Sequence, residues 1–132
     1  MAFKRIMVQE GGLTRVMRAG DNWDNPALSI VTADANATVT AQQVLSGVTV
    51  FTGFTAGRTL TTDTAANLAA AFPEMDIGDA YGFTVSIIPA FAGTWAAGTG
   101  VTLGGRATVP AATAVTIYLI RTGAAAFTWY VL

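Results

Sequence analysis

The sequence AVTIYLIRTGAAAFTWYVL, residues 114–132, decides the fold class. Two runs rich in β-branched and aromatic residues, Ala114 to Arg121 and Phe127 to Leu132, flank a turn signal at Thr122-Gly123. Short runs of this composition, bounded by turn residues, are typical of β-strands. A half-buried strand alternates polar and apolar residues, but these runs are apolar on both faces except for threonine. We therefore expect both faces of these strands to be covered.

Short strands of the same kind extend upstream as far as Ala27. Glycine-containing turns separate them, for example at Ser46-Gly47 and Gly104-Gly105. Many short strands at such spacing predict an all-β fold, a small β-sandwich or barrel-like domain over residues 27–132. The other candidate strands are Leu28 to Thr32, Ala37 to Leu45, Val48 to Phe51, Thr59 to Thr61, Ala80 to Ile88 and Val101 to Leu103.

One short helix interrupts this pattern. The alanine-rich run from Thr64 to Ala71 follows two residues able to cap a helix, Thr62 and Asp63, and Phe72-Pro73 ends it. A helix of this length is unstable on its own. We therefore expect it to pack on a sheet.

Residues 1–26 form a separate region, an N-terminal extended arm or hairpin. Close to half of all the charged residues of the chain lie there. Two strand-like pieces, Phe3 to Gln9 and Leu13 to Arg18, flank the turn pair Gly11-Gly12. The segment from Asp21 to Pro26 has the composition of a loop.

Charge is scarce in the chain as a whole. Only 11% of the residues are charged, whereas an average soluble domain carries roughly 25%. The net charge of −1 gives no field to attract nucleic acid or anionic lipid. The chain has no His and no Cys, which excludes the usual zinc sites and the Ser-His-Asp and Cys-His nucleophile systems. We therefore expect no cofactor, no metal and no nucleic-acid partner.

A membrane partner is not expected either. The uncharged stretch from Ala80 to Gly105 is long enough to span a bilayer. Pro89 and several glycines divide it into short pieces with turns between them. The apolar run at Ile6-Met7-Val8 is too short for the core of a signal peptide.

Few residues are candidates for chemistry. Glu74, Asp76 and Asp79 form an acidic cluster that could bind Ca²⁺ or act as a glycosidase-like acid/base pair. A solvated loop explains the cluster better. The loop around Asp21 and Asp24 lacks the full spacing of a calcium motif, and the segment Gly98 to Gly104 lacks the lysine and the following helix of a phosphate loop. We therefore expect no enzyme activity.

Aromatic and threonine side chains allow two further interpretations. Exposed aromatics could line a sugar site, although aromatics on strands more often form cores or interfaces. A regular threonine array could bind ice, but the sequence has no repeat of fixed period, and strand propensity explains the threonines better. The aromatic residues concerned are Trp23, Trp95, Trp129, Tyr81, Tyr118 and Tyr130.

The two-sided apolar strands predict an obligate homo-oligomer. In so short a chain, a second subunit is the simplest cover for a second apolar face. Burying a few hundred Å² at about 25 cal/mol per Å² would contribute several kcal/mol before association costs are subtracted. The candidate oligomer-interface residues are Val115, Ile117, Leu119, Phe127, Trp129 and Val131.

Several motifs between Val44 and Leu132 carry a likeness to a known family. They are Leu45-Ser46-Gly47, the segment Arg58 to Leu68, the bend Ile77-Gly78-Asp79 before the strand Tyr81 to Ile88, the segment Ala97 to Gly105, and the closing Tyr130-Val131-Leu132. In these motifs the chain resembles a small β-domain of tailed phages and some large viruses, found in capsid decoration (cement) proteins and in head-fibre or spike modules. No catalytic residue comes with the resemblance.

The resemblance implies a virion structural protein that binds the outer surface of a capsid and stabilises it, as a trimer. The partners would be other copies of the chain and the major capsid (coat) protein. The protein would be made in the host cytoplasm and reside on the capsid surface. The alternative is a head-fibre or tail-tip module that recognises a receptor or glycan.

The N-terminal region lies outside the resemblance. Its basic residues, interleaved with apolar ones, would suit an arm that docks onto an acidic shell of coat protein by pairing with an edge strand. An ordinary edge hairpin with solvated charges is an equal alternative. The candidate capsid-docking residues are Phe3, Lys4, Arg5, Arg15 and Arg18.

Overall fold

A computed structural model describes residues 7–10, 13–16 and 27–132 of the chain. The first two segments are the strands β1 (Met7–Glu10) and β2 (Leu13–Val16). They pair antiparallel, with Met7 opposite Val16 and Glu10 opposite Leu13. Over these residues the structure confirms the two strands predicted on either side of Gly11-Gly12.

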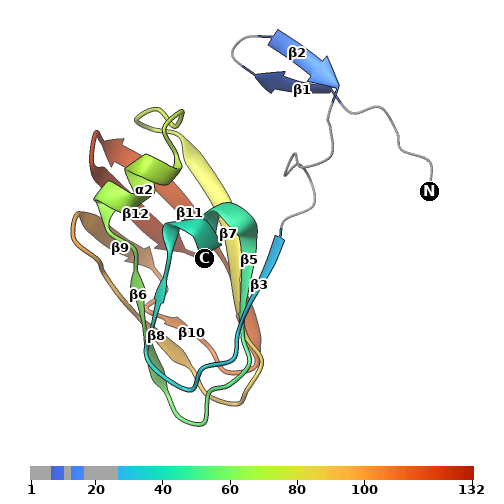
Figure 1. Cartoon of the computed structure of the whole chain (residues 1–132). Coiled ribbons are helices and arrows are strands. Elements are labelled where there is room, and N and C mark those ends of the chain that lie inside the picture. Colours follow the sequence, from blue (N-terminus) through green and yellow to red (C-terminus); the bar gives the residue numbers. More distant parts are fainter. Residues whose placement is uncertain (1–6, 11–12, 17–26) are drawn as a thin grey trace.

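The remaining strands form two sheets that face each other (Figure 1). The described chain is thus a small, mainly-β domain, as expected, and neither sheet closes into a barrel. The six-stranded sheet contains, in spatial order, β3 (Ala27–Val31), β5 (Gly47–Phe51), β7 (Ala80–Ile87), β11 (Thr113–Gly123), β12 (Ala126–Val131) and β9 (Val101–Gly105). The four-stranded sheet contains β10 (Thr108–Val109), β8 (Gly93–Ala96), β6 (Arg58–Thr62) and β4 (Ala37–Val39).

From β3 to β11 the chain changes sheet at every strand. From β3 to β8, two successive crossings return the chain to the same sheet in its original direction, whereas β10 runs antiparallel to β8. Neighbours within a sheet are therefore parallel along β3, β5 and β7, and again along β4, β6 and β8. Parallel neighbours need a long crossover connection, and here a strand of the opposite sheet forms part of each one.

Two short helices lie at one end of the sheets, α1 (Ala41–Ser46) and α2 (Ala65–Ala71) (Figure 1). The prediction of α2 is confirmed, but Thr64 caps it in place of Thr62 or Asp63. The Thr64 side chain accepts a hydrogen bond from the backbone N–H of Asn67 at 3.2 Å.

The helix α1 was not expected, because the sequence predicted one strand from Ala37 to Leu45. That prediction is wrong beyond Val39. Thr40 and Gln43 form a reciprocal capping box, and Gly47 ends the helix with a positive φ of 96°. These local hydrogen bonds outweigh the strand preference of Val44 and Leu45.

Asp63 joins the starts of the two helices. Its carboxylate accepts hydrogen bonds from the backbone N–H of Ala41 at 2.7 Å, from that of Thr64 at 2.7 Å and from the side chain of Asn67 at 2.8 Å. Burial raises the pKa of this carboxyl, but the three hydrogen bonds outweigh burial, so its pKa lies below the usual value.

The sequence patterns did not predict two strands of the four-stranded sheet, β8 and β10. The segment Gly93 to Ala96 has only one bulky side chain, Trp95, between small residues, so its pattern is weak. Pairing with neighbouring strands stabilises this segment as a strand. β8 lies between β6 and β10, with Leu60 opposite Trp95 and Thr94 opposite Thr108.

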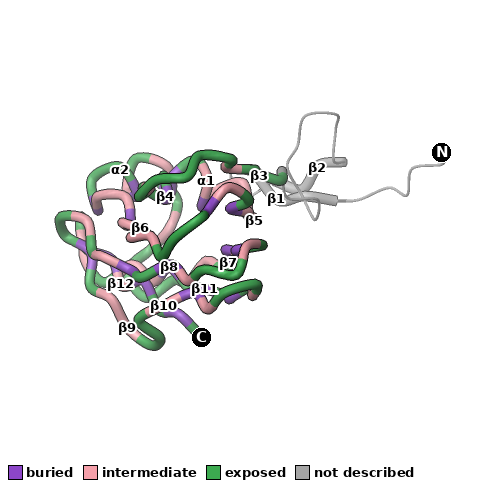
Figure 2. Tube along the Cα trace, turned by 90° about the horizontal axis from the view of Figure 1, so that it is seen from below, coloured by how far each residue is buried: buried purple, intermediate pink, exposed green. Residues whose placement is uncertain are grey.

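The core lies between the two sheets, and buried residues alternate with exposed ones along many strands (Figure 2). Trp129 of β12 is fully buried at its centre. The Trp129 ring contacts Phe83 of the same sheet and Trp95 of the opposite sheet, at centroid distances of 4.8 Å and 5.3 Å. Edge-to-face contacts of this kind add to the stabilisation from burial.

Thr49 of β5 provides a test of this core. Its side chain is buried, and its hydroxyl has no hydrogen-bond partner in the part of the chain that the structure describes. A buried polar group without a partner destabilises a fold by roughly 1–3 kcal/mol. We predict that Thr49→Val raises the free energy of unfolding, measured by urea titration, by about 1 kcal/mol. A loss of stability would show that the hydroxyl has a partner.

Candidate docking surface

The inward positions of β11 and β12 hold all six residues that the sequence predicted to form an oligomer interface. Each is buried inside the single chain and belongs to its core. The interface assignment of these residues is therefore corrected, because a side chain packed between the two sheets is unavailable to a second copy. The six residues are Val115, Ile117, Leu119, Phe127, Trp129 and Val131.

The alternate positions of the same strands point away from the four-stranded sheet. Thr116 and Tyr118 are exposed on β11, as is Tyr130 on β12. The sequence contains a signal for this choice of face. From Val115 to Leu119 and from Phe127 to Val131, the buried positions hold hydrocarbon side chains and Trp129, whereas the outward positions between them all carry a hydroxyl group, which can stay in solvent.

The outward residues form rows across the six-stranded sheet, and we call this surface the outer face. The strand register places Leu28 opposite Val48, Val48 opposite Thr84, and Thr84 opposite Thr116. The row continues to the end of the chain, where the backbone N–H of Leu132 donates to the carbonyl of Thr116 at 3.0 Å. A second row holds Ile30, Val50, Ser86 and Ala114.

Two tyrosines lie side by side at the other half of the outer face. Tyr118 and Tyr130 are register partners, and Gly82 and Gly104 flank them on the neighbouring strands. A Cβ atom at Gly82 would lie 3.2 Å from the Tyr118 ring, and one at Gly104 would lie 2.8 Å from the Tyr130 ring. The two glycines therefore leave room for the tyrosine rings to lie over the sheet.

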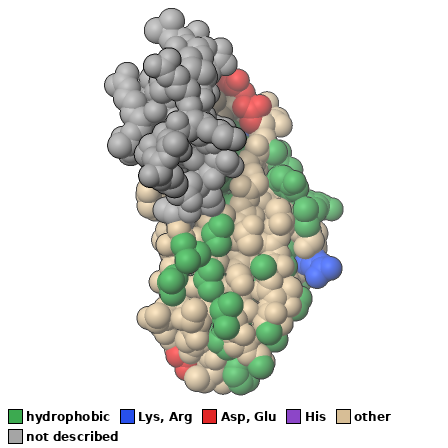
Figure 3. Space-filling view, turned by 90° about the vertical axis from the view of Figure 1, so that its right-hand side faces the viewer, with side chains coloured by type: hydrophobic (Ala, Val, Ile, Leu, Met, Phe, Trp, Pro, Cys, Tyr) green, Lys and Arg blue, Asp and Glu red, His purple; other side chains and the backbone are tan. Residues whose placement is uncertain are grey.

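No outward side chain of the outer face carries a charge, among those that the structure describes. Figure 3 views the molecule from the side on which β3, β5 and β7 lie, and charged groups appear only near the margins of that view. Apolar side chains are scattered between uncharged ones over its middle. The outer face thus lacks the charged groups that normally keep a surface in water.

The other exposed sheet surface is different in chemistry. On the four-stranded sheet the outward positions are mostly threonines, in register across neighbouring strands. Their hydroxyl groups can hydrogen bond with water without any charge. The residues are Thr38, Thr59, Thr61, Thr94 and Thr108.

The acidic cluster lies in the exposed segment between α2 and β7. A carboxylate oxygen of Asp79 accepts a hydrogen bond from the backbone N–H of Asp76 at 2.9 Å, which closes a turn. Glu74 is also exposed. Among the described residues, no group of three His, Cys, Asp or Glu side chains is placed to hold a metal ion. The geometry of this cluster is that of a loop stabilised by its own side chain.

The predicted capsid-docking residues lie mostly beyond the described part of the chain. Phe3, Lys4, Arg5 and Arg18 fall outside the described residues, and so does the loop of Asp21 and Asp24. Arg15 lies in β2, at the position opposite Val8 of β1.

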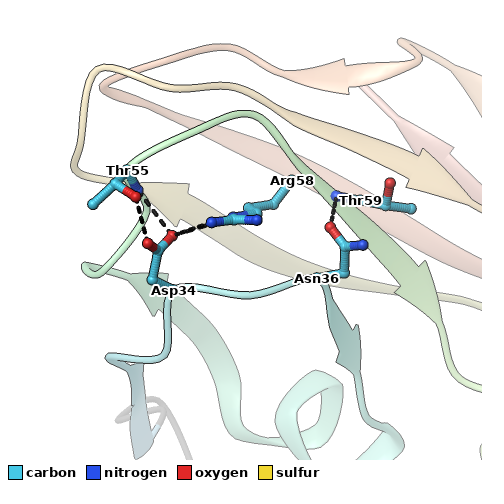
Figure 4. A network of polar contacts seen from close by, with 5 residues as sticks. All are labelled: Asp34, Asn36, Thr55, Arg58 and Thr59. Carbon is cyan, nitrogen blue, oxygen red and sulfur yellow. Dashed lines mark hydrogen bonds and ion pairs between the residues drawn. The ribbon is translucent and has the colours of Figure 1, made fainter.

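A polar network around Asp34 fixes the loops at the end of the molecule opposite the helices (Figures 1 and 4). Asp34, between β3 and β4, accepts hydrogen bonds from the backbone N–H of Thr55 at 2.9 Å and from the Thr55 hydroxyl. The guanidinium of Arg58 donates two further bonds to it, at 2.7 Å and 3.1 Å. Next to this network, Asn36 accepts from the backbone N–H of Thr59 at 2.9 Å.

In the Asp34 network, the charges of Asp34 and Arg58 neutralise each other. The hydrogen bonds from Thr55 and then the bonds from Arg58 lower the pKa of Asp34 from 3.8 to about 2. The chain is held so closely here that a Cβ at Gly53 would lie 1.9 Å from the carbonyl oxygen of Thr32.

The longest helix that the structure describes, α2, has seven residues, so none of the described helices is able to cross a membrane.

No protein-family model, curated protein or solved structure matches the chain.

The Asp34 network predicts a dependence of stability on pH. A carboxyl whose pKa is lower in the folded state stabilises the fold above its unfolded pKa, and this contribution is lost as the pH falls through the folded pKa. We expect Asp34→Asn to lower the melting temperature at pH 7, and we expect the difference from the wild type to shrink between about pH 4 and pH 2. Thermal unfolding followed by circular dichroism measures this difference.

Glu74→Gln is the matched control, because Glu74 is exposed and makes no hydrogen bond or ion pair within the described residues. Glu74→Gln removes the same charge as Asp34→Asn but breaks no such contact. The melting temperature at pH 7 should therefore stay almost unchanged. A difference between Asp34→Asn and the wild type that stays constant down to pH 2 would contradict the role of the Asp34 carboxylate.

Proposed function

We propose that this chain is a non-enzymatic structural protein of a virion, which binds the outside of a viral capsid as a homo-oligomer and stabilises the shell. The observation that supports this proposal most is the outer face, a surface of six strands without a charged side chain. A surface of this kind favours permanent contact with protein over exposure to water. The oligomer would be the trimer that the resemblance implies, built from sandwich-like domains.

The distribution of charge supports a division of labour within the chain. The stretch from Ala80 to Leu132 contains only two charged residues, Arg106 and Arg121, whereas the first 26 residues contain close to half of all the charges. In this proposal the basic residues of the N-terminal region contact acidic groups of the coat protein. Several weak contacts of this type, one set from each copy, would combine into tight binding through multivalency.

Several of the described charged residues have structural tasks that fit a non-enzymatic role. Asp34 and Arg58 fix loops, and Asp63 joins the helix starts. Arg121 donates to the carbonyl oxygens of Met75 and Ala124, at 2.7 Å and 2.5 Å. These contacts use the charged groups within the fold.

A second candidate function, glycan binding by a head-fibre or tail-tip module, has one specific observation in its favour. Tyr118 and Tyr130 form a half-exposed aromatic pair, and the hydroxyls of Thr116 and Thr128 lie two residues away along the same strands. Aromatic rings beside hydroxyl groups suit the apolar face of a sugar ring. Binding of neutral oligosaccharides that Tyr130→Ala abolishes would favour this candidate.

The capsid proposal predicts binding to shells that lack the protein. Purified protein should co-sediment with such shells and raise their melting temperature, because it would link neighbouring coat subunits. The two should reach a fixed ratio at saturation, as expected for a lattice of equivalent sites. Sedimentation followed by calorimetry of the shells measures both effects.

Arg15→Glu together with Arg18→Glu should weaken this binding and make it less dependent on salt concentration, since the contact is proposed to be electrostatic. Protein that stays in the supernatant at every salt concentration would overturn the capsid proposal.

A further inference from the structure

The outer face is extensive enough to be a subunit interface. Its outward positions form four staggered rows of four or five residues, and at about 4.8 Å between strands and about 6.6 Å between rows they cover a footprint of about 500 Å² before side chains are counted. A standard protein–protein interface buries about 800 Å² of accessible surface on each partner. This footprint is not continuously apolar, because hydroxyl groups of Thr84, Ser86, Thr102, Thr116 and Thr128 lie among its apolar side chains.

The apolar side chains on this face are far from buried in the single chain. Leu28 and Ile30 of β3 are 59% and 58% exposed, and Leu132 is 50% exposed. Tyr118 and Tyr130 are 40% and 43% exposed. Within the part of the chain that the structure describes, both the aliphatic half and the tyrosine half of the face are therefore uncovered.

The absence of charge indicates what kind of partner fits. Around a symmetry axis, identical residues of neighbouring copies come close together, so a charged residue near the axis would meet its own like charge. The outward positions of all six strands avoid this conflict in the described chain. A surface for an acidic or basic partner would instead carry complementary charge. The outer face has the chemistry of a surface that meets its own copies.

We infer that the outer face is covered by further copies of this chain, with Tyr118 and Tyr130 and the apolar residues of β3 and β5 inside the contact. This inference rests on the homo-oligomer of the proposed function and names the surface that forms it. It places the contact on the outward positions of the six-stranded sheet, which leaves the threonine surface of the four-stranded sheet in solvent.

Two threonine-to-lysine variants test this inference as a matched pair. Thr116 of β11 is an exposed strand residue on the outer face, and Thr94 of β8 is an exposed strand residue on the threonine surface. A lysine at position 116 would bring an unpaired charge into the contact, whereas one at position 94 would stay in water. Native mass spectrometry and sedimentation equilibrium report the mass, with circular dichroism as the test of folding.

The wild type and Thr94→Lys should have the same oligomeric mass, with a trimer expected. Thr116→Lys should fall to the 13.6 kDa of a single chain at the same concentration. Ile30→Lys provides an independent second variant, because Ile30 lies on the edge strand β3 and its exposed side chain contributes little to the core. It should dissociate the oligomer as well.

Three results would overturn the inference: a monomeric wild type at tens of micromolar, folded Thr116→Lys and Ile30→Lys variants with the wild-type mass, or dissociation by Thr94→Lys. Shell binding is measured separately from the oligomeric mass, so a failure of capsid binding and a failure of the outer-face contact give different results. If the wild type is monomeric and binds shells, and if Thr116→Lys abolishes this binding, coat protein would be the occupant of the outer face. An oligomer that ignores shells would uphold this inference and overturn the capsid proposal.

Discussion

The packing of Trp129 against Phe83 and Trp95 holds the two sheets together, and the rest of the structure depends on it. It fixes which side of β12 points inward. Because side chains alternate along a strand, it also fixes which residues of β12 point outward. Strand pairing transmits this choice to β11 and β7, so the buried core and the exposed outer face are set by the same register.

Scarcity of charge shapes the surface that results. With 11% charged residues, the chain has little to spare for solvation. Several charges that the structure describes are also engaged in internal contacts, such as the Asp34 network at one end and Asp63 at the helix starts. The threonine surface of the four-stranded sheet is solvated by hydroxyl groups instead. The outer face has neither charge nor a continuous layer of hydroxyls, and this difference distinguishes the two exposed sheet surfaces.

Sequence patterns predicted most strands of the domain because glycine turns and β-branched runs mark them locally. They failed at α1, where the capping box of Thr40 and Gln43 overrides strand preference. They also failed at β8, a four-residue strand defined by its neighbours more than by its own composition. The alternation of successive strands between the two sheets is a property of the whole chain, and no local sequence pattern encodes it.

The sequence predicted that both faces of β11 and β12 need cover, but the six residues that it assigned to an oligomer interface belong to the core of the single chain. Both faces of β11 and β12 carry large apolar or aromatic side chains, and the hydroxyl groups of the outward threonines and tyrosines are the main difference between the two faces. The decisive detail is the kind of aromatic residue at each position. Trp129 fills the space between the sheets, whereas Tyr118 and Tyr130 lie over glycines of neighbouring strands with their rings half exposed. Those glycines become neighbours of the tyrosines only through the fold.

The most direct test of the covered outer face is the reactivity of the tyrosines in the unmodified protein. The chain has three tyrosines, and Tyr81 serves as the internal reference because its hydroxyl donates to the carbonyl of Leu45 at 3.0 Å within the fold. Nitration, located by mass spectrometry, can be followed across a range of protein concentrations. The outer-face account predicts that Tyr118 and Tyr130 are protected at high concentration and become reactive on dilution, while Tyr81 does not change. Reactivity of Tyr118 and Tyr130 that is high at every concentration would contradict it.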